Sequence, residues 1–446
     1  MTPVILALAC LGSQGIDEAA LFSDTTVVAS PPAATAPSMA DSVTKTRLLA
    51  SGDLEALGQA SWKRSASIPG SGDGAARMVG TANIDVRLPS GERALAVLEV
   101  AQEASADTTA FAVRELFLDA DIADHVWIRA GKQVLQWGRG ALWTPTDLVN
   151  VEGRTLVERP GAREGATGLR VQIPVGRGSV TAFAPLARVD ASDSLSAALR
   201  AEAVVGPAEI ALSSWFKKDA PHVVGFDAST GLWGFDLQAG ALWLSGDLEP
   251  RAVLRDGIWH LERDDSRGQV RASAGIGRDF KVDGVPDRLR VDVEGFWQSE
   301  GYGSDVLSDE TVRPWADTVW MPLDPGLAKA GEAMGSSLGR GIPTTRGDGL
   351  GFLAGHGLFR SMNHGPLYLG GMATLRKFLV PDLSLTLQTL ANLEDQSGVS
   401  TCGLLWESLH GFHVQPLVYA FWGEPRSEFT LDGRGVAVEL RAGLRF

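Results

Sequence analysis

The chain ends in the stretch GVAVELRAGLRF, residues 435–446, in which apolar and polar positions alternate up to the last residue. One face of the pattern carries Val436, Val438, Leu440, Ala442, Leu444 and Phe446, and the other carries Gly435, Ala437, Glu439, Arg441, Gly443 and Arg445. Side chains of a β-strand point alternately to opposite faces, so a period of two predicts a strand. The stretch is longer than the roughly 5–6 residues usual for strands of soluble proteins.

The same alternation recurs along most of the chain. It is clear from Arg288 to Gln298, where Arg290, Asp292 and Glu294 oppose apolar residues, and it returns at 82–88, 169–173, 270–280 and 383–392. Clusters of turn-forming residues separate these segments. We count about 18 strands, with a range of 16–20 because 252–263 and 350–361 are each compatible with an additional strand.

The composition of the two strand faces favours a transmembrane β protein over a soluble one. Soluble β-sandwiches also alternate, but here the polar faces carry full charges, and the apolar faces end in aromatic residues as interfacial girdles do. Those aromatic residues are Trp243, Trp297, Trp422 and Phe446. No stretch reaches the ~20 apolar residues of a membrane-spanning helix. We therefore predict an all-β protein, a closed antiparallel transmembrane β-barrel, because closure satisfies every strand edge within the bilayer.

The order of segments predicts how the chain is organised. The apolar run Val4–Leu11 fits the core of a secretory signal, so we expect a signal peptide over 1–24, with lipidation at Cys10 left open. Residues 25–50 should form a flexible periplasmic lead-in, and 51–446 the barrel, with long outer loops at 138–163, 247–267 and 300–365. The net charge of −14 argues against nucleic acid as a partner.

Two groups of motifs resemble a porin-like family of outer-membrane barrels whose function is largely uncharacterised. The first group is Arg114-Glu115-Leu116, Gly131-Lys132-Gln133 and Trp137-Gly138, followed by Asp147 and Asn150. The second is Asn392-Leu393-Glu394-Asp395-Gln396-Ser397-Gly398 with Ser427-Glu428-Phe429 and the terminal Phe446. Alginate-export-type barrels are a more distant likeness. The resemblance implies outer-membrane lipid as surroundings and the barrel-assembly machinery as a partner, with Phe446 as the assembly signal.

Charged residues on the predicted inner faces are candidates for lining a pore. They are Arg114, Glu115, Lys132, Arg288, Arg290, Asp292, Glu294, Glu439 and Arg441. Strict alternation places Arg114 opposite Lys132 and turns both towards lipid, where a charge costs about 2–4 kcal/mol at the bilayer midplane. Either a β-bulge near Gly131 re-aims them inwards or the assumed register is wrong. A network that braces the wall is the alternative to a pore-lining cluster.

Signals of catalysis are weak. Gly335-Ser336-Ser337-Leu338-Gly339 matches the nucleophile-elbow pattern, but it lies in a glycine-dense loop rather than between a strand and a helix. The histidines show no metal-ligand spacing. We predict no catalytic residue, no metal site, no cofactor and no enzymatic activity.

The leading functional hypothesis is a channel for passive, substrate-selective diffusion of small solutes. A plugged receptor or structural barrel is the first alternative, and an outer-membrane enzyme the second. Basic and acidic residues on the clean strand faces nearly balance, which predicts weak ion selectivity inside. We also expect part of the loop 300–365 to fold inwards and narrow the lumen, with a solvated outer cap as the alternative.

Overall fold

The computed structural model describes the segments 46–63, 72–105, 109–147, 163–186, 196–218, 220–255, 258–303, 364–424, 427–430 and 433–446, with residues 149 and 353, and without 124, 136 and 409. The predicted signal region, Cys10 and Asn150 lie outside these residues, as does nearly all of 304–363. No helix within the described segments is long and apolar enough to cross a membrane.

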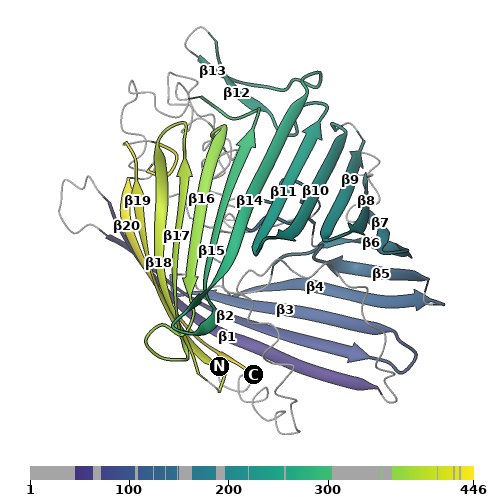
Figure 1. Ribbon diagram of the computed structural model, residues 1–446, viewed down its shortest axis with the longest axis horizontal. Helices are drawn as coiled ribbons and strands as arrows, with labels where there is room; N and C mark the ends of the chain where they lie inside the picture. Colours follow the sequence, from purple (N-terminus) through teal and green to yellow (C-terminus); the bar gives the residue numbers. More distant parts are fainter. Residues whose placement is uncertain are drawn as a thin grey trace. The chain divides into compact units, whose positions relative to one another are not determined.

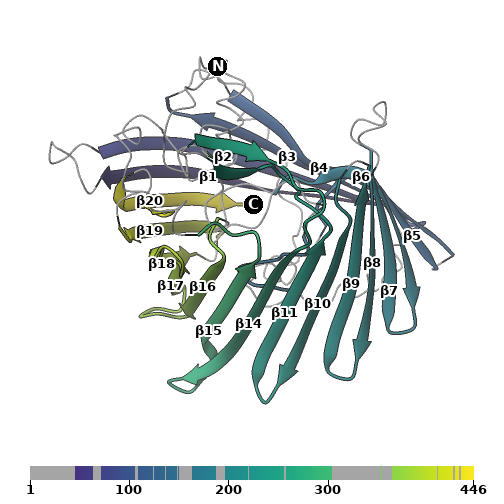
Figure 2. The same cartoon turned by 90° about the horizontal axis from the view of Figure 1, so that it is seen from above.

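Eighteen strands pair in one antiparallel sheet, as the sequence predicted. They are β1 (Arg47–Lys63), β2 (Gly72–Arg87), β3 (Arg93–Glu103), β4 (Thr109–Ile122), β5 (Val126–Gln133), β6 (Ala166–Val175), β7 (Gly178–Pro185), β8 (Ser196–Val205), β9 (Ala208–Lys217), β10 (Val223–Leu232), β11 (Phe235–Leu244), β14 (Gln269–Val282), β15 (Val285–Gln298), β16 (Leu367–Leu375), β17 (Leu383–Asn392), β18 (Ser397–Glu407), β19 (Phe412–Trp422) and β20 (Arg434–Arg445). Each strand pairs with its neighbours in the chain, and β1 also pairs with β20, from Asp53 opposite Arg445 to Lys63 opposite Arg434. This last pairing closes the sheet into a barrel (Figures 1 and 2).

The two remaining strands form a separate hairpin. β12 (Arg251–Arg255) pairs only with β13 (Ile258–Glu262), within the connection between β11 and β14. The region 252–263, which the sequence left open as a barrel strand, is therefore a hairpin outside the barrel sheet. The first barrel strand begins at Arg47, before the expected boundary at residue 51, because β1 extends along β2 as far as Arg87.

Connections between strands differ at the two ends of the barrel. Tight turns occupy one end, such as Asp283-Gly284 between β14 and β15, where both residues have positive φ. Positive φ at two central residues is the geometry of the hairpin turn that follows the natural strand twist. The long connections after β5, β11 and β15 all lie at the other end, because antiparallel strands alternate in direction. The grouping matches the sequence prediction.

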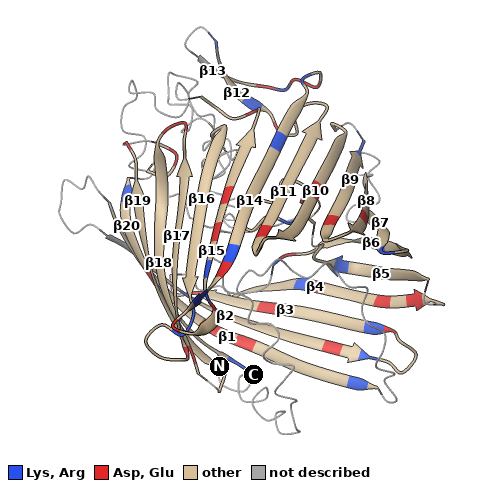
Figure 3. Cartoon of the chain, viewed as in Figure 1, with Lys and Arg blue, Asp and Glu red and all other residues tan. Residues whose placement is uncertain are grey.

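The predicted faces are observed. On β20, Leu440 is 52% exposed, whereas its neighbours Glu439 and Arg441 are 8% and 7% exposed. On β15, Val293 and Trp297 are exposed, whereas Arg290, Asp292 and Glu294 are buried. Large apolar residues thus cover the outside of the barrel, and charged residues line its inner face. Figure 3 marks where the charged positions fall along the strands.

Candidate functional site

The described first part of the connection that follows β5 turns inwards and lies against the inner face of the barrel. We call residues 137–147 the inner segment. It starts at Trp137, which is buried in a cluster with Leu135, Phe183 and Ala198. Gly138 then takes a positive φ of 83°, a left-handed conformation that glycine adopts without steric cost. The chain therefore changes direction immediately after a fixed aromatic anchor.

A single carboxylate on the barrel wall holds the middle of the inner segment. Glu294 of β15 is 1% exposed and accepts three backbone N–H bonds, from Ala141 at 2.8 Å, Leu142 at 2.9 Å and Trp143 at 3.0 Å. Gln238 Nε2 adds a fourth bond at 3.2 Å. A buried carboxylate is stable only with such partners. The inner segment therefore satisfies Glu294, and Glu294 holds the inner segment in place.

Apolar packing supports the same attachment. The Trp143 ring stacks on Phe296 of β15 at a centroid distance of 5.8 Å and an interplanar angle of 11°. Tyr368 of β16 lies 6.3 Å from the same ring. A Cβ on Gly370 would lie 2.3 Å from Leu142 Cδ1 and 3.1 Å from the Trp143 ring, so only glycine allows this approach. The segment is thus held both by hydrogen bonds to a charged group and by close apolar packing.

An ion-pair network binds the start of the inner segment to β8, β9 and β10. Arg139 bonds to Glu209, and its Nε lies 3.2 Å from Asp227 and an Nη 3.9 Å from Glu202. Asp227 also accepts two bonds from Arg200, at 2.7 and 2.8 Å. Both Arg200 and Asp227 are buried. A carboxylate shared between two arginines is a strong, charge-assisted arrangement.

The inner segment therefore contacts the inner faces of β8, β9, β10, β11, β14, β15 and β16, through the residues above and through Pro145 beside Gly240 and Trp143 beside Ser273. We expected residues 138–163 to form an outer loop, and the described part of that range instead follows the inside of the wall. Buried Glu294 explains the difference, because the backbone N–H groups of the inner segment donate three of the bonds that its carboxylate accepts.

A second charged cluster lies on the inner wall near the tight-turn end. Arg290 bonds to Asp236 at 2.6 Å, Asp279 at 2.8 Å and Asp292 at 2.8 Å. Arg288, two residues earlier, bonds to Asp283 of the turn at 2.5 Å and to the backbone oxygen of Lys377 at 3.0 Å. The structure brings the predicted residues Arg290 and Asp292 together, whereas Arg288 braces turns at the rim.

The Arg114 region shows a β-bulge, but on a different strand from the one expected. Val97 pairs with Glu115 and Leu98 with Val113, so Arg114 is the extra residue of β4. Its guanidinium reaches buried Glu99 with bonds of 2.6 and 3.0 Å. The bulge thus turns Arg114 inwards. Of the two alternatives left open, the assumed register was wrong, and the β4–β5 pairing has no register shift at Gly131.

Lys132 and Glu115 occupy different positions from those expected. Lys132 pairs with Leu116 rather than with Arg114, and Leu116 is exposed on the outer face. The Lys132 ammonium bonds to Glu164 at 2.8 Å, and the same carboxylate lies 3.9 Å from the Arg114 guanidinium. Glu115 accepts the backbone N–H of Val134 at 2.9 Å. Glu115 thus supports the exit of the chain from β5 towards the inner segment.

The motif pieces at the C-terminal end of the chain meet inside the barrel. Glu428 accepts bonds from Tyr368 Oη and Asn392 Nδ2, both at 2.7 Å, and its own N–H donates to Asp395 Oδ2 at 2.7 Å. Ser397 bonds to the other oxygen of Asp395 at 2.6 Å. The motifs around Asn392 and Glu428 therefore form one buried network that ties the β19–β20 connection to β16–β18.

The closing strand carries the last three predicted residues. Glu439 and Arg441 are two residues apart on the inner face of β20 and bond to each other at 2.5 Å. Phe446 exchanges two backbone bonds with Gly52 of β1, at 2.7 and 3.0 Å. Its ring lies over Gly52, where a Cβ would come within 2.6 Å of it. Phe446 thus completes the seam between the first and last strands.

This architecture defines a class: a closed 18-stranded barrel with an apolar outside, a charged inside and an inward-folded connection is a porin-type barrel. No protein-family model matches the chain, and no curated protein does.

Solved structures of outer-membrane porins share the fold. OccAB1 of Acinetobacter baumannii has a TM-score of 0.52 and 10% identity, with 89% of this chain and 96% of that chain covered. OccK9 (OpdG) of Pseudomonas aeruginosa has a TM-score of 0.52 and 8% identity, covering 90% and 98%. OccK2 (OpdF) of Pseudomonas aeruginosa, solved in complex with glucuronate, has a TM-score of 0.51 and 11% identity, covering 90% and 98%. At these identities the likeness concerns the fold. The likeness to alginate-export-type barrels stays a prediction.

Proposed function

We propose that the protein is an outer-membrane channel for the passive diffusion of small solutes, and that the inner segment is its constriction. The observation that carries this proposal is the attachment of Ala141, Leu142 and Trp143 to buried Glu294. A segment fixed along the inner face of a barrel reduces the cross-section available to solutes, and it presents the same groups to each one. Such a constriction is a means of selecting by size and polarity.

Within this proposal the inner-wall charges line the path of the solute. Arg114, Glu115, Arg290, Asp292, Glu294, Glu439 and Arg441 retain this role, whereas Lys132 pairs with an outer-face residue and Arg288 braces the rim. Oppositely charged groups along a pathway suit polar solutes that carry donors and acceptors. A similar fold holds glucuronate in OccK2, so sugar acids belong in a panel of test solutes beside neutral sugars and amino acids.

Ion conductance separates a channel from a plugged receptor or structural barrel. We expect the purified full chain to produce stepwise single-channel currents in a planar lipid bilayer, and to admit small sugars and sugar acids into liposomes in a swelling assay. A plugged barrel would leave the bilayer silent in the same protein-to-lipid range. The sample must show heat-modifiable migration, so that silence cannot be attributed to unfolded protein. An absence of single-channel currents from folded protein would contradict the proposal.

Ion selectivity of the channel should be weak. Arg290, Arg200, Arg139 and Arg441 are each bonded to inner carboxylates, so ion pairs offset part of the charge of the wall. Exposed acids, which contribute to the net charge of −14, attract cations to the mouth. We expect a cation-to-anion permeability ratio near one in concentrated salt and above one in dilute salt, since screening shortens the reach of exposed charges. Reversal potentials that strongly favour anions would contradict this assignment of the faces.

An enzymatic function receives no support from the comparisons, since the neighbours reported above are porins. The Gly335–Gly339 motif lies outside the described residues. Treatment with a serine-directed covalent probe, followed by mass measurement of the intact chain, tests this alternative directly.

A further inference from the structure

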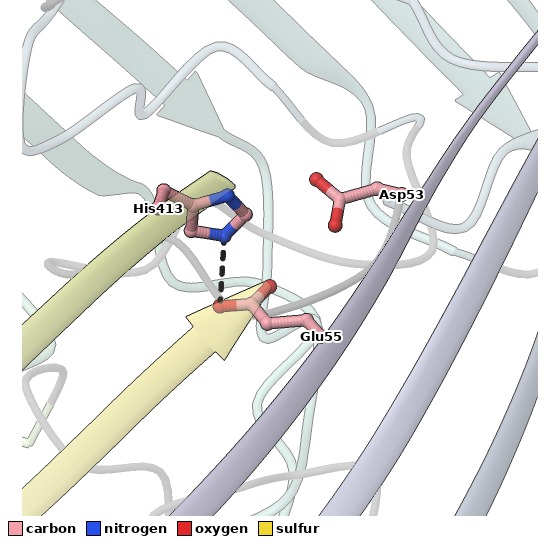
Figure 4. Close-up of side chains that lie close together, drawn as sticks. All are labelled: Asp53, Glu55 and His413. Carbon is pink, nitrogen blue, oxygen red and sulfur yellow. Dashed lines mark ion pairs between the residues drawn. The ribbon is translucent and has the colours of Figure 1, made fainter. Parts of the chain in front are cut away.

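Three potential metal ligands meet on the inner face of the barrel seam. Asp53 and Glu55 lie on β1, and His413 lies on β19 (Figure 4). One ligand atom from each lies within 4.8 Å of the others. Strand β20 runs between them, and its Gly443 pairs with both Glu55 and His413. A Cβ on Gly443 would lie 2.5 Å from the imidazole, so this glycine makes room for the ring.

Two potential ligand atoms in this cluster lack a hydrogen-bond partner among the described residues. His413 is 5% exposed, and its Nδ1 is buried with no hydrogen-bond partner among the described residues. The same holds for Oδ1 of Asp53. His413 Nε2 lies 4.0 Å from Glu55 Oε1, beyond hydrogen-bond length. Buried polar atoms are nearly always satisfied in native proteins, so two such atoms in one cluster indicate a missing partner.

Neighbouring cations leave these atoms free. Arg445 Nε lies 3.2 Å from Asp53 Oδ2, and the other end of that guanidinium bonds to Glu407 at 3.0 Å. Arg441 bonds to Glu439 on β20. Neither arginine satisfies Asp53 Oδ1 or the imidazole. Two carboxylates held close together on a partly buried wall repel each other, and a divalent cation between them would remove that repulsion.

We propose that Asp53, Glu55 and His413 bind a divalent transition-metal ion of the zinc class. One imidazole nitrogen and two carboxylate oxygens form a donor set typical of zinc, whereas calcium and magnesium take oxygen donors. Two carboxylates and a neutral imidazole also balance the charge of the ion. The ion joins β1 to β19 across β20, so it fastens the seam where the barrel closes. The inference does not depend on the channel function.

Zinc binding to the full-length protein in detergent tests the proposal. After EDTA treatment and removal of the chelator, titration with ZnCl2 followed by calorimetry is expected to give one zinc per chain, and zinc should raise the melting temperature of the barrel. The variants His413→Ala and Asp53→Asn should each weaken binding about tenfold or more, since even outer-shell changes cost 10–100-fold. The matched control is His410→Ala, which removes an exposed histidine of the β18–β19 turn from the same end of the barrel.

The variants also distinguish the alternatives. Heat-modifiable migration establishes that each variant is folded, and Asp53→Asn keeps the shape of the side chain if His413→Ala fails to fold. Wild-type protein that binds no more zinc than folded Asp53→Asn would overturn the proposal and leave a cluster filled by water. Equal loss of binding in His410→Ala would overturn it as well, because the zinc would then bind exposed histidines.

Discussion

Replacement of Glu294 with alanine is expected to raise single-channel conductance and to admit larger solutes. The change removes the acceptor of three backbone bonds from the inner segment, at 2.8–3.0 Å. Hydrogen bonds to charged groups contribute about 1.5–3 kcal/mol each, so three of them hold the segment with roughly 5 kcal/mol. A shift of about 5.5 kcal/mol takes a two-state equilibrium from 99:1 to 1:99. The middle of the segment should therefore separate from β15 in a larger fraction of molecules, while Trp143 packing and the Arg139 ion pairs still hold part of it.

Two companion variants show whether release of the segment is the cause. Glu439→Ala removes a carboxylate from the inner wall of β20 whose ion-pair partner is Arg441 of the same strand, so its conductance should stay near that of the wild type. Glu294→Gln retains one acceptor oxygen and should fall between wild type and Glu294→Ala. If Glu294→Ala and Glu439→Ala shift conductance equally, the effect comes from wall charge, and the constriction lies elsewhere.

Excision of residues 305–345 addresses the other candidate constriction. The predicted inward folding of 300–365 falls mainly on residues outside the described part of the chain and stays a prediction. If the loop does fold inwards, its excision should widen the pore, as Glu294→Ala should. If conductance rises in Glu294→Ala but not in the excision variant, the inner segment narrows the pore and the long loop does not.

Deletion of Phe446 is expected to prevent most of the protein from assembling in the outer membrane. In the folded barrel, Phe446 contributes two backbone bonds to Gly52, each worth about 0.5–1.5 kcal/mol net. That loss is small for a barrel of eighteen paired strands. Our hypothesis is that the assembly machinery recognises the terminal residue in cells. We therefore predict a large defect in cells and a small defect in refolding of purified protein in detergent. Heat-modifiable migration and surface accessibility measure both.

The substitution Gly52→Ala distinguishes a structural role of Phe446 at the β1–β20 seam from its role as an assembly signal. It places a Cβ within 2.6 Å of the Phe446 ring and 2.8 Å of the backbone oxygen of Thr81, while it keeps the terminal residue. We expect this variant to lower barrel stability in detergent more than deletion of Phe446 does, and to impair assembly in cells less. Normal assembly of the deletion variant in cells would refute the role of Phe446 as a signal.

Strand positions and faces were predictable from local pattern. The alternation at 435–446 and 288–298 reflects a period of two that the pleat imposes on every strand, so the exposed row of Leu440 and the buried row of Glu439 follow directly. The number of barrel strands followed from the same count. The hairpin at β12 and β13 shows the limit of this reasoning, because alternation does not say which sheet a strand joins.

Register and bulges were not predictable in this way. A single extra residue at Arg114 inverts the face of everything beyond it on β4, and nothing in the local pattern marks it. Arg114 reads as lipid-facing by strict alternation, yet it bonds to buried Glu99. Its partner is 15 residues away in the chain, and the shift between β3 and β4 decides that they meet.

The sequence by itself determined a closed barrel of about eighteen strands, an apolar outside, a charged inside and long connections at one end, because these follow from a residue-by-residue period and from the length of each segment. Only the tertiary structure decided which connection folds inwards, since Glu294 is about 150 residues from the N–H groups it accepts. It alone also brought Asp53 and Glu55 beside His413 from opposite ends of the chain. Closure of the sheet places its first and last strands together, and local sequence patterns do not indicate contacts between residues so far apart in the chain.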